Sequence, residues 1–322
     1  MKAIVTGATG GLGRNLVAAL LARGDEVLAL GRNTAIGASL NTTFTACELS
    51  DSQAVLAAFE SADVVFHCAA LSSPWGEAAD FQRANVDATR HILQAMAHHH
   101  IEKIVYVSTS SVYFDFKDRR NVTENFLPKQ FVNHYARTKY QTERLILGHP
   151  CQSVIIRPRG IFGEHDQVLV PRLLRVAEKG VLPLVKRLGK PAGSALVDVT
   201  YVGNVVQALL LCADKPVPSQ SIFNISNQEP LTIAEIYRLI ADKLQKNFRY
   251  QAVPYPVLCA AATAMETTAK AHLTGEPLLT QYALGLISYD QTLNNDKARN
   301  ILGYRPQFSI AEGLQRYGAH HD

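Results

Sequence analysis

The string TGATGGLG, from Thr6 to Gly13, is the part of the sequence that most clearly predicts the fold. It follows an apolar run at Ala3–Val5 that is typical of a buried strand. It opens a stretch in which leucines recur every four residues on one helical stripe, at Leu12, Leu16 and Leu20. A strand, a glycine-rich turn and a helix in this order indicate the first unit of a parallel α/β sheet.

The glycines of this string allow the backbone to bind a phosphate group. Gly7, Gly10 and Gly13 permit positive φ angles and let a pyrophosphate approach the positive N-terminus of the helix. Glycine-rich turns without a ligand are common, but the preceding strand and the following helix favour a dinucleotide site. The residues expected to contact that cofactor here are Gly7, Thr9, Gly10, Gly11, Leu12 and Gly13.

Strands and helices continue to alternate through the first half of the chain. Apolar runs that suit strands covered on both faces occur at Lys2–Val5, Glu26–Leu30, Thr43–Cys47, Asp63–Cys68, Ile104–Ser108 and Ser153–Arg157. The predicted fold class is α/β: a Rossmann-type doubly wound parallel sheet with a smaller, mostly C-terminal substrate-binding domain.

The second half of the chain is less regular. Capping boxes at Thr232 with Glu235 and at Ser309 with Glu312 predict two helix starts. Phe223–Ile225 predicts a late strand that returns to the sheet. We therefore assign residues 1–163 to a dinucleotide-binding domain, with 200–228 returning to it, and residues 164–199 and 229–322 to a substrate-binding domain.

Composition and charge narrow the function classes. The 322 residues are 47% hydrophobic and 19% charged, as in a globular protein, and the net charge of +4 comes without the long Lys or Arg run that would indicate nucleic-acid binding. The most apolar late stretch, Ala252–Ala264, is too short to span a bilayer, and Met1 leads straight into a strand without room for a signal peptide. We expect a cytoplasmic protein without a transmembrane segment, and leave a homodimer open.

Neither a metal site nor a disulfide is expected. The five cysteines lie far apart, and an odd, scattered set is typical of reduced thiols in the cytosol. The triplet His98–His100 is interpreted as a solvated helix end, because no acidic or Cys partner is spaced to complete a metal site.

The residues after the second predicted strand favour NADP(H) over NAD(H). An Asp or Glu there would accept hydrogen bonds from the ribose 2′-hydroxyl of NAD, but the position holds Gly31, followed by Arg32. A guanidinium can grip a 2′-phosphate with its fork of donors, and Arg14 could assist. The alternative is that Arg32 is a solvated loop residue.

Tyr135 and Lys139 form the candidate catalytic pair. They stand four residues apart in the helical stretch HYARTKYQTERLIL, so they share one face. Because an adjacent ammonium favours the phenolate, we expect the tyrosine to exchange a proton near neutral pH, and the lysine also to hold the cofactor ribose. A second pair with this spacing, Tyr113 and Lys117, lies in a segment without helical period, and we reject it.

A run of hydroxyl groups supplies the context for this pair. Ser108–Ser111 lies at the carboxyl end of the fifth predicted strand, the edge at which parallel sheets bind ligands. A hydroxyl there can hydrogen-bond a substrate carbonyl or alcohol. The alternative is ordinary turn chemistry, since Ser and Thr commonly end strands.

Together these motifs resemble the extended short-chain dehydrogenase/reductases, of the NAD-dependent epimerase/dehydratase superfamily. The resemblance covers essentially the whole chain and rests on TGATGGLG, HCAA at 67–70, Asn85-Val86, STSSVY at 108–113, YARTK at 135–139 and IRPRGIFG at 156–163. DVTYVGNV at 198–205 and GEPLLT at 275–280 look most like the branch of 3β-hydroxysteroid and sterol 4α-carboxylate dehydrogenases. They are also similar to bacterial 2-alkyl-3-oxoalkanoate reductases of olefin biosynthesis.

The resemblance implies roles for further residues. Thr109 would be the hydroxyl partner of Tyr135, with Ser108 and Ser110 as alternatives. The cofactor cleft would be lined by Ala69, Ala70, Asn85 and Pro158, and the adenine flanked by Glu48 and Leu49, the first where the family usually has Asp.

Two departures from the nucleotide-sugar enzymes of the family favour an apolar substrate. Those enzymes usually carry an Arg before the Asp of D-x-x-Y-V and an Asn in R-x-x-N-x-Y-G, where this chain has Val197 and Gly160. A diphosphate needs cationic donors. The apolar segment Val253–Ala264 is predicted to form a wall or lid over the substrate or, alternatively, the core of a small domain.

Three functions remain in competition. The first is hydride transfer between NADP(H) and a ketone or secondary alcohol on an apolar small molecule, such as a 3-oxo acid or a sterol. The second is a nucleotide-sugar epimerase or dehydratase that recycles its hydride. The third is a binding protein that senses NADP(H) on the same fold; the intact set of Thr109, Tyr135 and Lys139 weighs against it.

Overall fold

The computed structural model describes residues 1–322 except 178–180, 244, 272, 274 and 322. At its centre lies a parallel sheet of seven strands in the order β12-β7-β5-β4-β1-β2-β3. The strands are β1 Lys2–Thr6, β2 Glu26–Gly31, β3 Thr43–Ala46, β4 Val64–His67, β5 Lys103–Val107, β7 Gln152–Pro158 and β12 Ser221–Ile225.

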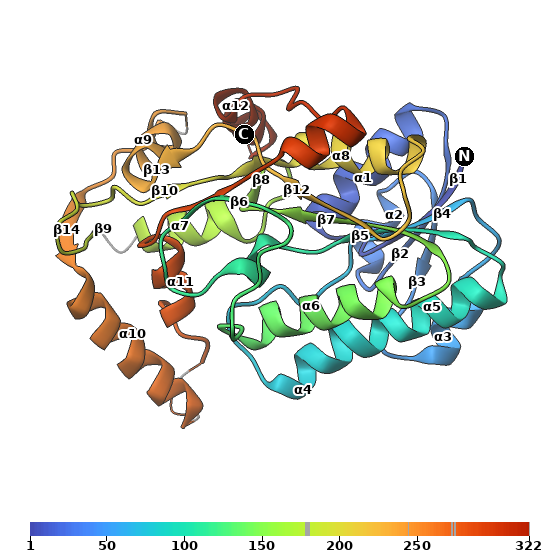
Figure 1. Ribbon diagram of the computed structural model, residues 1–322, viewed down its shortest axis with the longest axis horizontal. Coiled ribbons are helices and arrows are strands. Elements are labelled where there is room, and N and C mark those ends of the chain that lie inside the picture. The colour runs from blue at the N-terminus through green and yellow to red at the C-terminus, as the bar shows by residue number, and fades with distance from the viewer. Residues whose placement is uncertain (178–180, 244, 272, 274, 322) are drawn as a thin grey trace.

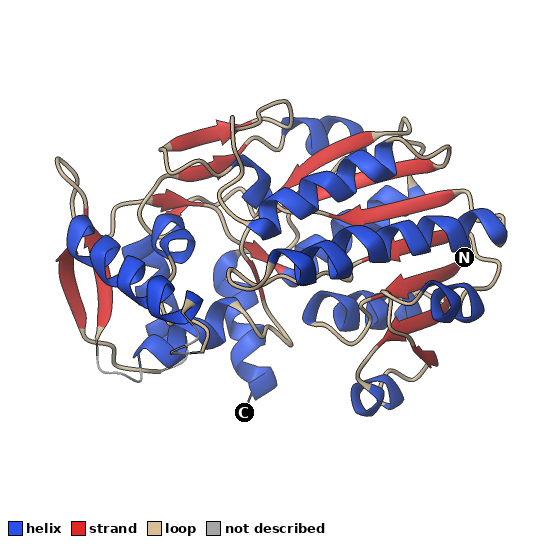
Figure 2. Ribbon diagram, turned by 90° about the horizontal axis from the view of Figure 1, so that it is seen from below, coloured by secondary structure: helices blue, strands red, loops and turns tan. Residues whose placement is uncertain are grey.

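Helices cover both faces of this sheet (Figures 1 and 2). α1 (Gly11–Ala22) and α8 (Val202–Asp214) bury an apolar core with one face, through side chains such as Leu16 and Leu209. α3 (Ser52–Ala58), α5 (Ala88–His98) and α6 (His134–Leu147) bury the other face, through side chains such as Ile92 and Ile146. Two covered faces explain why the strands are apolar on both sides.

The six predicted strands of the first half are confirmed, with ends that differ by no more than one residue. Phe223–Ile225 lies in β12, the edge strand beside β7, as predicted. Both capping boxes also form. Thr232 Oγ1 accepts from Glu235 N while Glu235 Oε2 accepts from Thr232 N, and Ser309 and Glu312 pair in the same way. They begin α9 (Ile233–Lys243) and α12 (Ile310–His321).

A smaller region stands beside the carboxyl edge of the sheet. It has a four-stranded sheet of β13 (Leu231–Thr232), β10 (Leu196–Val197), β15 (Gln291–Leu293) and β6 (Arg119–Val122), and the pairs β8 (Ile161–Phe162) with β11 (Thr200–Tyr201) and β9 (Leu182–Lys186) with β14 (Tyr250–Pro254). Its helices include α7 (Leu169–Ala177), α10 (Tyr255–Lys270) and α11 (Gln281–Leu286). Its apolar core joins α9, α12 and residues around β10 and β11.

Short helical segments connect these parts. They are α2 (Thr34–Ala38), α4 (Ala78–Phe81), a π-helical turn at Gln82–Asp87, a 3-10 turn at Ser110–Tyr113 and a second π-helical turn at Ala298–Leu302. Within the part of the chain that the structure describes, no helix is long and apolar enough to cross a membrane, and no three His, Cys, Asp or Glu side chains gather as metal ligands.

Candidate active site

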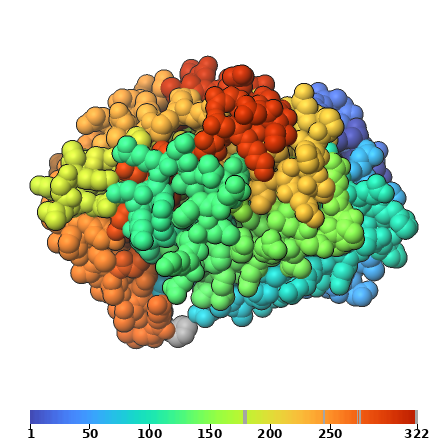
Figure 3. Space-filling view, viewed as in Figure 1, coloured from blue at the N-terminus to red at the C-terminus, as the bar shows by residue number. Residues whose placement is uncertain are grey.

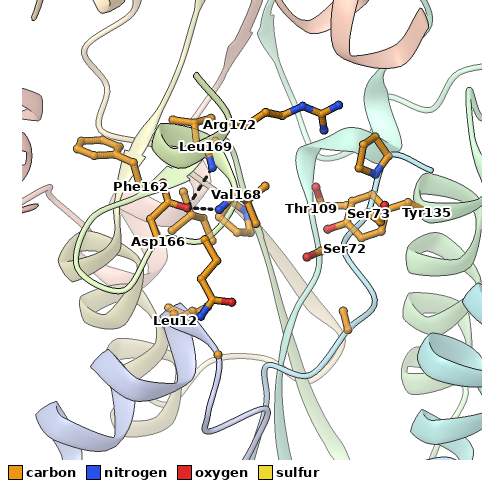
Figure 4. Close-up of a pocket in the computed structure, with 18 of the residues that line it drawn as sticks. Leu12, Ser72, Ser73, Thr109, Tyr135, Phe162, Asp166, Val168, Leu169 and Arg172 are labelled. Atoms are coloured by element: carbon orange, nitrogen blue, oxygen red, sulfur yellow. Dashed lines mark hydrogen bonds between the residues drawn. The ribbon is translucent and has the colours of Figure 1, made fainter. Parts of the chain in front are cut away.

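A cavity of about 1150 Å³ lies at the carboxyl ends of the central strands. Its lining comes from the segments that follow β1, β2, β3, β4, β5 and β7, from α6, and from α7, α9 and α11 of the smaller region. Figure 4 shows Thr109 and Tyr135 on one side, facing Leu12, Phe162 and Asp166 across the cavity. This is the edge at which parallel sheets bind ligands, next to the point where the strand order reverses.

The turn after β1 is shaped by residues that lack a Cβ. Gly7 has a φ of +71°, and a Cβ on it would lie 2.7 Å from the backbone nitrogen of Ala69. A Cβ on Gly13 would lie 2.1 Å from the carbonyl oxygen of Gly7. Gly10, the N-cap of α1, provides no side-chain cap, and the first turn of α1 holds no acidic residue. The N–H groups in the first turn of α1 are thus left for an anion, and the cradle fits a dinucleotide pyrophosphate.

The six residues expected around this turn all line the cavity, as do Ala69, Ala70 and Pro158. Asn85 does not line it. Its buried amide accepts from the backbone nitrogen of Leu71 at 2.7 Å and donates to Thr138 Oγ1 at 3.0 Å. Asn85 therefore ties the segment after β4 to α6, and its expected place at the cofactor is not what the structure shows.

The end of β2 and the segment after β3 form the far end of the cavity. Gly31, Arg32, Glu48 and Leu49 line it, whereas Arg14 does not. A Cβ on Gly31 would lie 2.8 Å from Thr9 Oγ1, so a longer side chain there would displace Thr9. The Arg32 side chain is 80% exposed, and its Nη1 lies 3.7 Å from Glu48 Oε2. An exposed guanidinium is free to turn toward a phosphate, although Glu48 competes for it.

Tyr135 and Lys139 both face the cavity from the first turns of α6, which Asn133 caps through a bond from Ala136 N. The Thr109 hydroxyl and the Tyr135 phenol lie on the same side of the cavity (Figure 4). Lys139 is 1% exposed, and its Nζ donates to the carbonyl oxygen of Val107 at 2.6 Å. The structure thus brings Thr109, Tyr135 and Lys139 together at the end of β5.

Burial, rather than the charge of Lys139, governs proton affinity in this cluster. Burial raises the pKa of Tyr135, with a smaller opposing effect from the nearby Thr109 hydroxyl. Burial also lowers the pKa of Lys139 to about 7, against the attraction of Glu143. The expectation that the ammonium would lower the pKa of the phenol is therefore wrong in this structure, because the Lys139 ammonium bonds the backbone of β5 instead.

Two further hydroxyls extend the cluster. Thr109 Oγ1 donates to Ser111 Oγ at 3.0 Å, and Ser111 Oγ lies 2.5 Å from the hydroxyl of Tyr282. Tyr282 comes from α11, far along the chain, and sequence reasoning missed it because no local pattern marks that residue. The result is a hydrogen-bonded chain of hydroxyls from Thr109 through Ser111 to Tyr282 along the cavity.

The alternatives to this set have other partners. Ser108 donates to the buried carboxylate of Glu143, so its hydroxyl is not available to replace Thr109. Tyr113, of the rejected pair, is 4% exposed; its hydroxyl donates to Asn224 Oδ1 at 2.7 Å and accepts from Arg157 Nη1 at 2.7 Å. Tyr113 does not line the main cavity, which agrees with its rejection.

The apolar wall of the cavity comes from an unexpected place. Val253–Ala264 forms the end of β14 and most of α10, and none of these residues lines the cavity. α10 instead runs along the outer corner of the molecule, at the lower left in Figures 1 and 3. The prediction that this segment walls the substrate is therefore wrong. The apolar wall consists of Leu173, Val176, Leu182, Ile236, Tyr237, Ile240, Leu278, Leu279, Leu286 and Ile287.

The cavity lining also includes three arginines to which sequence reasoning gave no role, of which the first, Arg83, is exposed and pairs with Asp80. Arg159 follows β7 and is 7% exposed, and Arg172 lies on α7, where its Nη2 donates to the carbonyl oxygen of Leu278 at 3.3 Å. Val197 and Gly160 replace the Arg and Asn that usually contact a diphosphate. An anionic group in this cavity would nevertheless lie near the guanidinium groups of Arg159 and Arg172.

Comparisons with known proteins agree with this geometry. The model of the NAD dependent epimerase/dehydratase family matches residues 3–226. The chain is 35% identical to the uncharacterized protein YbjS of Escherichia coli, over 99% of this chain and 97% of that protein. It is 30% identical to the 2-alkyl-3-oxoalkanoate reductase of Shewanella oneidensis, over 98% and 85% of the two chains.

A steroid enzyme and a solved structure extend this picture. The mouse (Mus musculus) sterol-4-alpha-carboxylate 3-dehydrogenase, decarboxylating, is 28% identical over 98% of this chain and 89% of its own. The crystal structure of UDP-glucuronic acid 4-epimerase from Bacillus cereus in complex with NAD superimposes with a TM-score of 0.77, covering 99% and 96% of the two chains at 21% identity. At that identity the structural likeness concerns the fold.

Proposed function

The chain belongs to the NAD-dependent epimerase/dehydratase family, and we propose that it is an NADP(H)-dependent oxidoreductase that interconverts a ketone and a secondary alcohol on a largely apolar substrate. The observation that carries the proposal is that Tyr135, Thr109 and Lys139 meet at the end of β5, inside a cavity that has an apolar wall. Relatives named as a ketone-type reductase and a sterol dehydrogenase support the same class of chemistry.

The residues of the cleft fit a nicotinamide dinucleotide, which would supply or accept the hydride when bound. The glycine turn from Gly7 to Gly13 would hold its pyrophosphate, and Ala69 and Ala70 would lie against it. Lys139 would hold the nicotinamide ribose, from a position one turn along α6 from Tyr135.

Tyr135 is suited to act as the acid in ketone reduction. Because burial raises its pKa, the phenol stays protonated at neutral pH and can donate that proton to the substrate oxygen. A substrate oxygen placed between Thr109 and Tyr135 would accept a hydrogen bond from Tyr135, and one from Thr109 when that hydroxyl turns from Ser111 to the substrate. In the reverse direction, the deprotonated form of the same oxygen takes the proton of the alcohol.

The preference for NADP(H) rests on Arg32. It follows Gly31, which stands where NAD-dependent proteins of this architecture usually place a carboxylate, and its exposed guanidinium can form a fork of bonds to a 2′-phosphate. We expect Arg32→Ala to weaken NADPH binding by about 1–3 kcal/mol, the range for a charge-assisted hydrogen bond and its unpaired partner, and to leave NADH nearly unchanged. Fluorescence titration of both cofactors measures this; tighter binding of NADH by the unmodified protein would contradict the preference.

A nucleotide-sugar epimerase is the second candidate, and the arginines of the cavity are the observation in its favour. The apolar wall of α9 and the Leu278–Leu279 segment offers a sugar hydroxyl few partners, which favours the first candidate. Cofactor-oxidation assays with 3-oxo acids, steroids and UDP-sugars separate the two. Net NADPH loss with a 3-oxo compound or a steroid supports the reductase, and turnover of a UDP-hexose without net NADPH loss supports the epimerase.

A further inference from the structure

Arg159 is a buried cation that forms no ion pair within hydrogen-bonding distance among the residues that the structure describes. It lies between β7 and β8, is 7% exposed and lines the cavity. Its Nε has no hydrogen-bond partner, and no ion pair of Arg159 occurs with any residue that the structure describes. Burying a charged guanidinium in this way costs free energy unless something else compensates for it.

Another arginine of the same segment shows how the fold satisfies such a group when its role is structural. Arg157, two residues earlier, is 2% exposed. Its Nε donates to Glu143 Oε1 at 2.8 Å, its Nη2 pairs with the other oxygen of that carboxylate, and its Nη1 donates to Tyr113 and to the carbonyl oxygen of Glu124. By contrast, the guanidinium of Arg159 is left open on the side of the cavity.

Two groups near Arg159, Tyr282 and Asp198, favour its charged form, but neither forms a hydrogen bond with its guanidinium. Burial lowers the pKa of Arg159, while Tyr282 and then Asp198 oppose that shift. Asp198 Oδ2 accepts from Leu293 N at 2.6 Å, so this carboxylate holds β15 in place. Tyr282 belongs to the chain of hydroxyls that leads through Ser111 to Thr109. The guanidinium therefore stands beside the groups that would hold the reacting oxygen.

A second space on the other side of Arg159 is too small for a substrate group. This space measures about 10 Å³ and is bordered by Ser110, Gln291 and Thr292. That volume is about the minimum for one water molecule. A ligand for Arg159 must therefore enter from the main cavity.

Building on the proposed function, we propose that Arg159 is a specificity-determining residue that binds a carboxylate of the substrate, so that the natural substrate is a 3-oxo or 3-hydroxy acid rather than a neutral ketone, alcohol or ester. A guanidinium matches the planar carboxylate with two parallel N–H···O bonds. A carboxylate two bonds from the reacting carbon places a negative charge beside Arg159 while the oxygen on that carbon lies between Thr109 and Tyr135. The alkyl part then extends along the apolar wall. The attraction between the substrate carboxylate and the Arg159 guanidinium would then offset the free-energy cost of burying each of them.

The test compares an acid with its own methyl ester, since the ester removes only the charge. Oxidation of a long-chain 3-hydroxy acid and of its methyl ester by NADP⁺ is followed in the unmodified protein, in Arg159→Gln and in Arg159→Lys. Arg144→Gln is the matched control, because Arg144 is exposed on α6 and does not line the cavity. Thermal unfolding and NADPH titration show whether each variant folds and binds cofactor.

We expect the unmodified protein to prefer the acid by at least about 10-fold in kcat/KM. Arg159→Gln should lower kcat/KM for the acid by about 10- to 100-fold and leave the ester within about 3-fold, and Arg159→Lys should restore part of the loss for the acid. Arg144→Gln should keep the preference of the unmodified protein.

Three results would overturn the assignment. Equal use of acid and ester by the unmodified protein, or an equal loss for both in Arg159→Gln, would show that Arg159 has a packing role while the reductase proposal stands. Epimerisation of a UDP-hexose that Arg159→Gln abolishes would assign the cation to a phosphate. If the unmodified protein binds NADPH but neither oxidises these alcohols nor reduces the matching ketones, the proposed function fails, and the role of Arg159 with it.

Discussion

At the scale of single residues, the site depends on how deeply its ionisable groups are buried. Tyr135 and Lys139 are neighbours on α6, yet the ammonium donates to Val107 on β5, and burial determines the direction of both pKa shifts. Spacing along a helix predicts that two side chains share a face, but the partner that each chooses depends on the strands packed beneath them.

Tyr135→Phe removes the acid of the proposed reaction. We expect kcat to fall by at least about 100-fold with the NADPH affinity unchanged, because the phenol donates a proton and does not hold the cofactor. Lys139→Ala should reduce both turnover and cofactor affinity. Tyr113→Phe is the matched control: Tyr113 bonds Asn224 and Arg157 outside the cavity, so its loss should lower stability and leave kcat nearly intact. Steady-state kinetics with cofactor titration measure this, and a larger kcat loss in Tyr113→Phe would show that the wrong pair was chosen.

Lys139 makes a pH-dependent contribution to stability. Burial lowers the pKa of Lys139 from its ordinary value of 10.5 to about 7 in the folded protein, so the unfolded chain binds more protons between these pH values. The free energy of unfolding therefore rises with pH from about 7 to about 10.5 because of Lys139. Below a pH of about 7 the protein carries the full destabilisation that comes from burying the charged ammonium. Lys139→Met removes the buried charge. Relative to the unmodified protein, the unfolding midpoint of the variant should therefore be highest near pH 6 and lowest near pH 9.5.

Denaturation of both proteins at a series of pH values measures that difference. The variant also loses the hydrogen bond to Val107, but that loss is the same at every pH. It therefore does not alter how the difference in stability between the two proteins changes with pH. A difference in stability that stays constant from pH 6 to 9.5 would show that Lys139 does not titrate in this range.

At the scale of elements, a buried ion pair fixes α6 against the sheet. Glu143 on α6 accepts from Arg157 on β7 and from Ser108 after β5, so one carboxylate joins three elements. Arg157→Met would leave that carboxylate buried and unpaired. We expect a loss of about 3–5 kcal/mol in the free energy of unfolding, measured with urea, and recovery of most of it when Glu143→Leu is added. A loss below about 1 kcal/mol in the single variant would show that the pair does not hold α6.

The elements that local sequence patterns specify were predictable, and those that depend on distant contacts were not. TGATGGLG predicts β1, its turn and α1, because glycine and apolar periodicity act within a few residues. Tyr282 of α11 lies in the site, whereas Val253–Ala264 lies at the outer corner of the molecule and not in the cavity. Both positions depend on how the smaller region packs. Arg159 stood within the string IRPRGIFG, yet its lack of a partner is visible only in three dimensions.

At the scale of the whole molecule, the cavity lies between the large sheet and the smaller region, with polar groups at the sheet edge and apolar groups opposite. A substrate with a longer alkyl chain should therefore bind better until the apolar wall is covered. At about 0.8 kcal/mol for each buried CH₂, kcat/KM should rise about 4-fold per methylene over part of a 3-oxo acid series.

A control for this series comes from α10. Val257 is 58% exposed and lies outside the cavity, so Val257→Ser should leave the dependence on chain length unchanged. A flat specificity across the series in the unmodified protein would show that the apolar side chains serve only as core.

The central claim is net hydride transfer from NADPH to a substrate ketone at Tyr135, and following the hydride itself tests it most directly. The purified protein is supplied with NADPH deuterated at the transferable position and with a long-chain 3-oxo acid, and the product is analysed by mass spectrometry. We predict one deuterium on the new carbinol carbon for each NADPH consumed, and neither product nor NADPH loss with Tyr135→Phe. Interconversion of UDP-hexoses without net NADPH consumption, together with no deuterium in any alcohol product, would contradict the account.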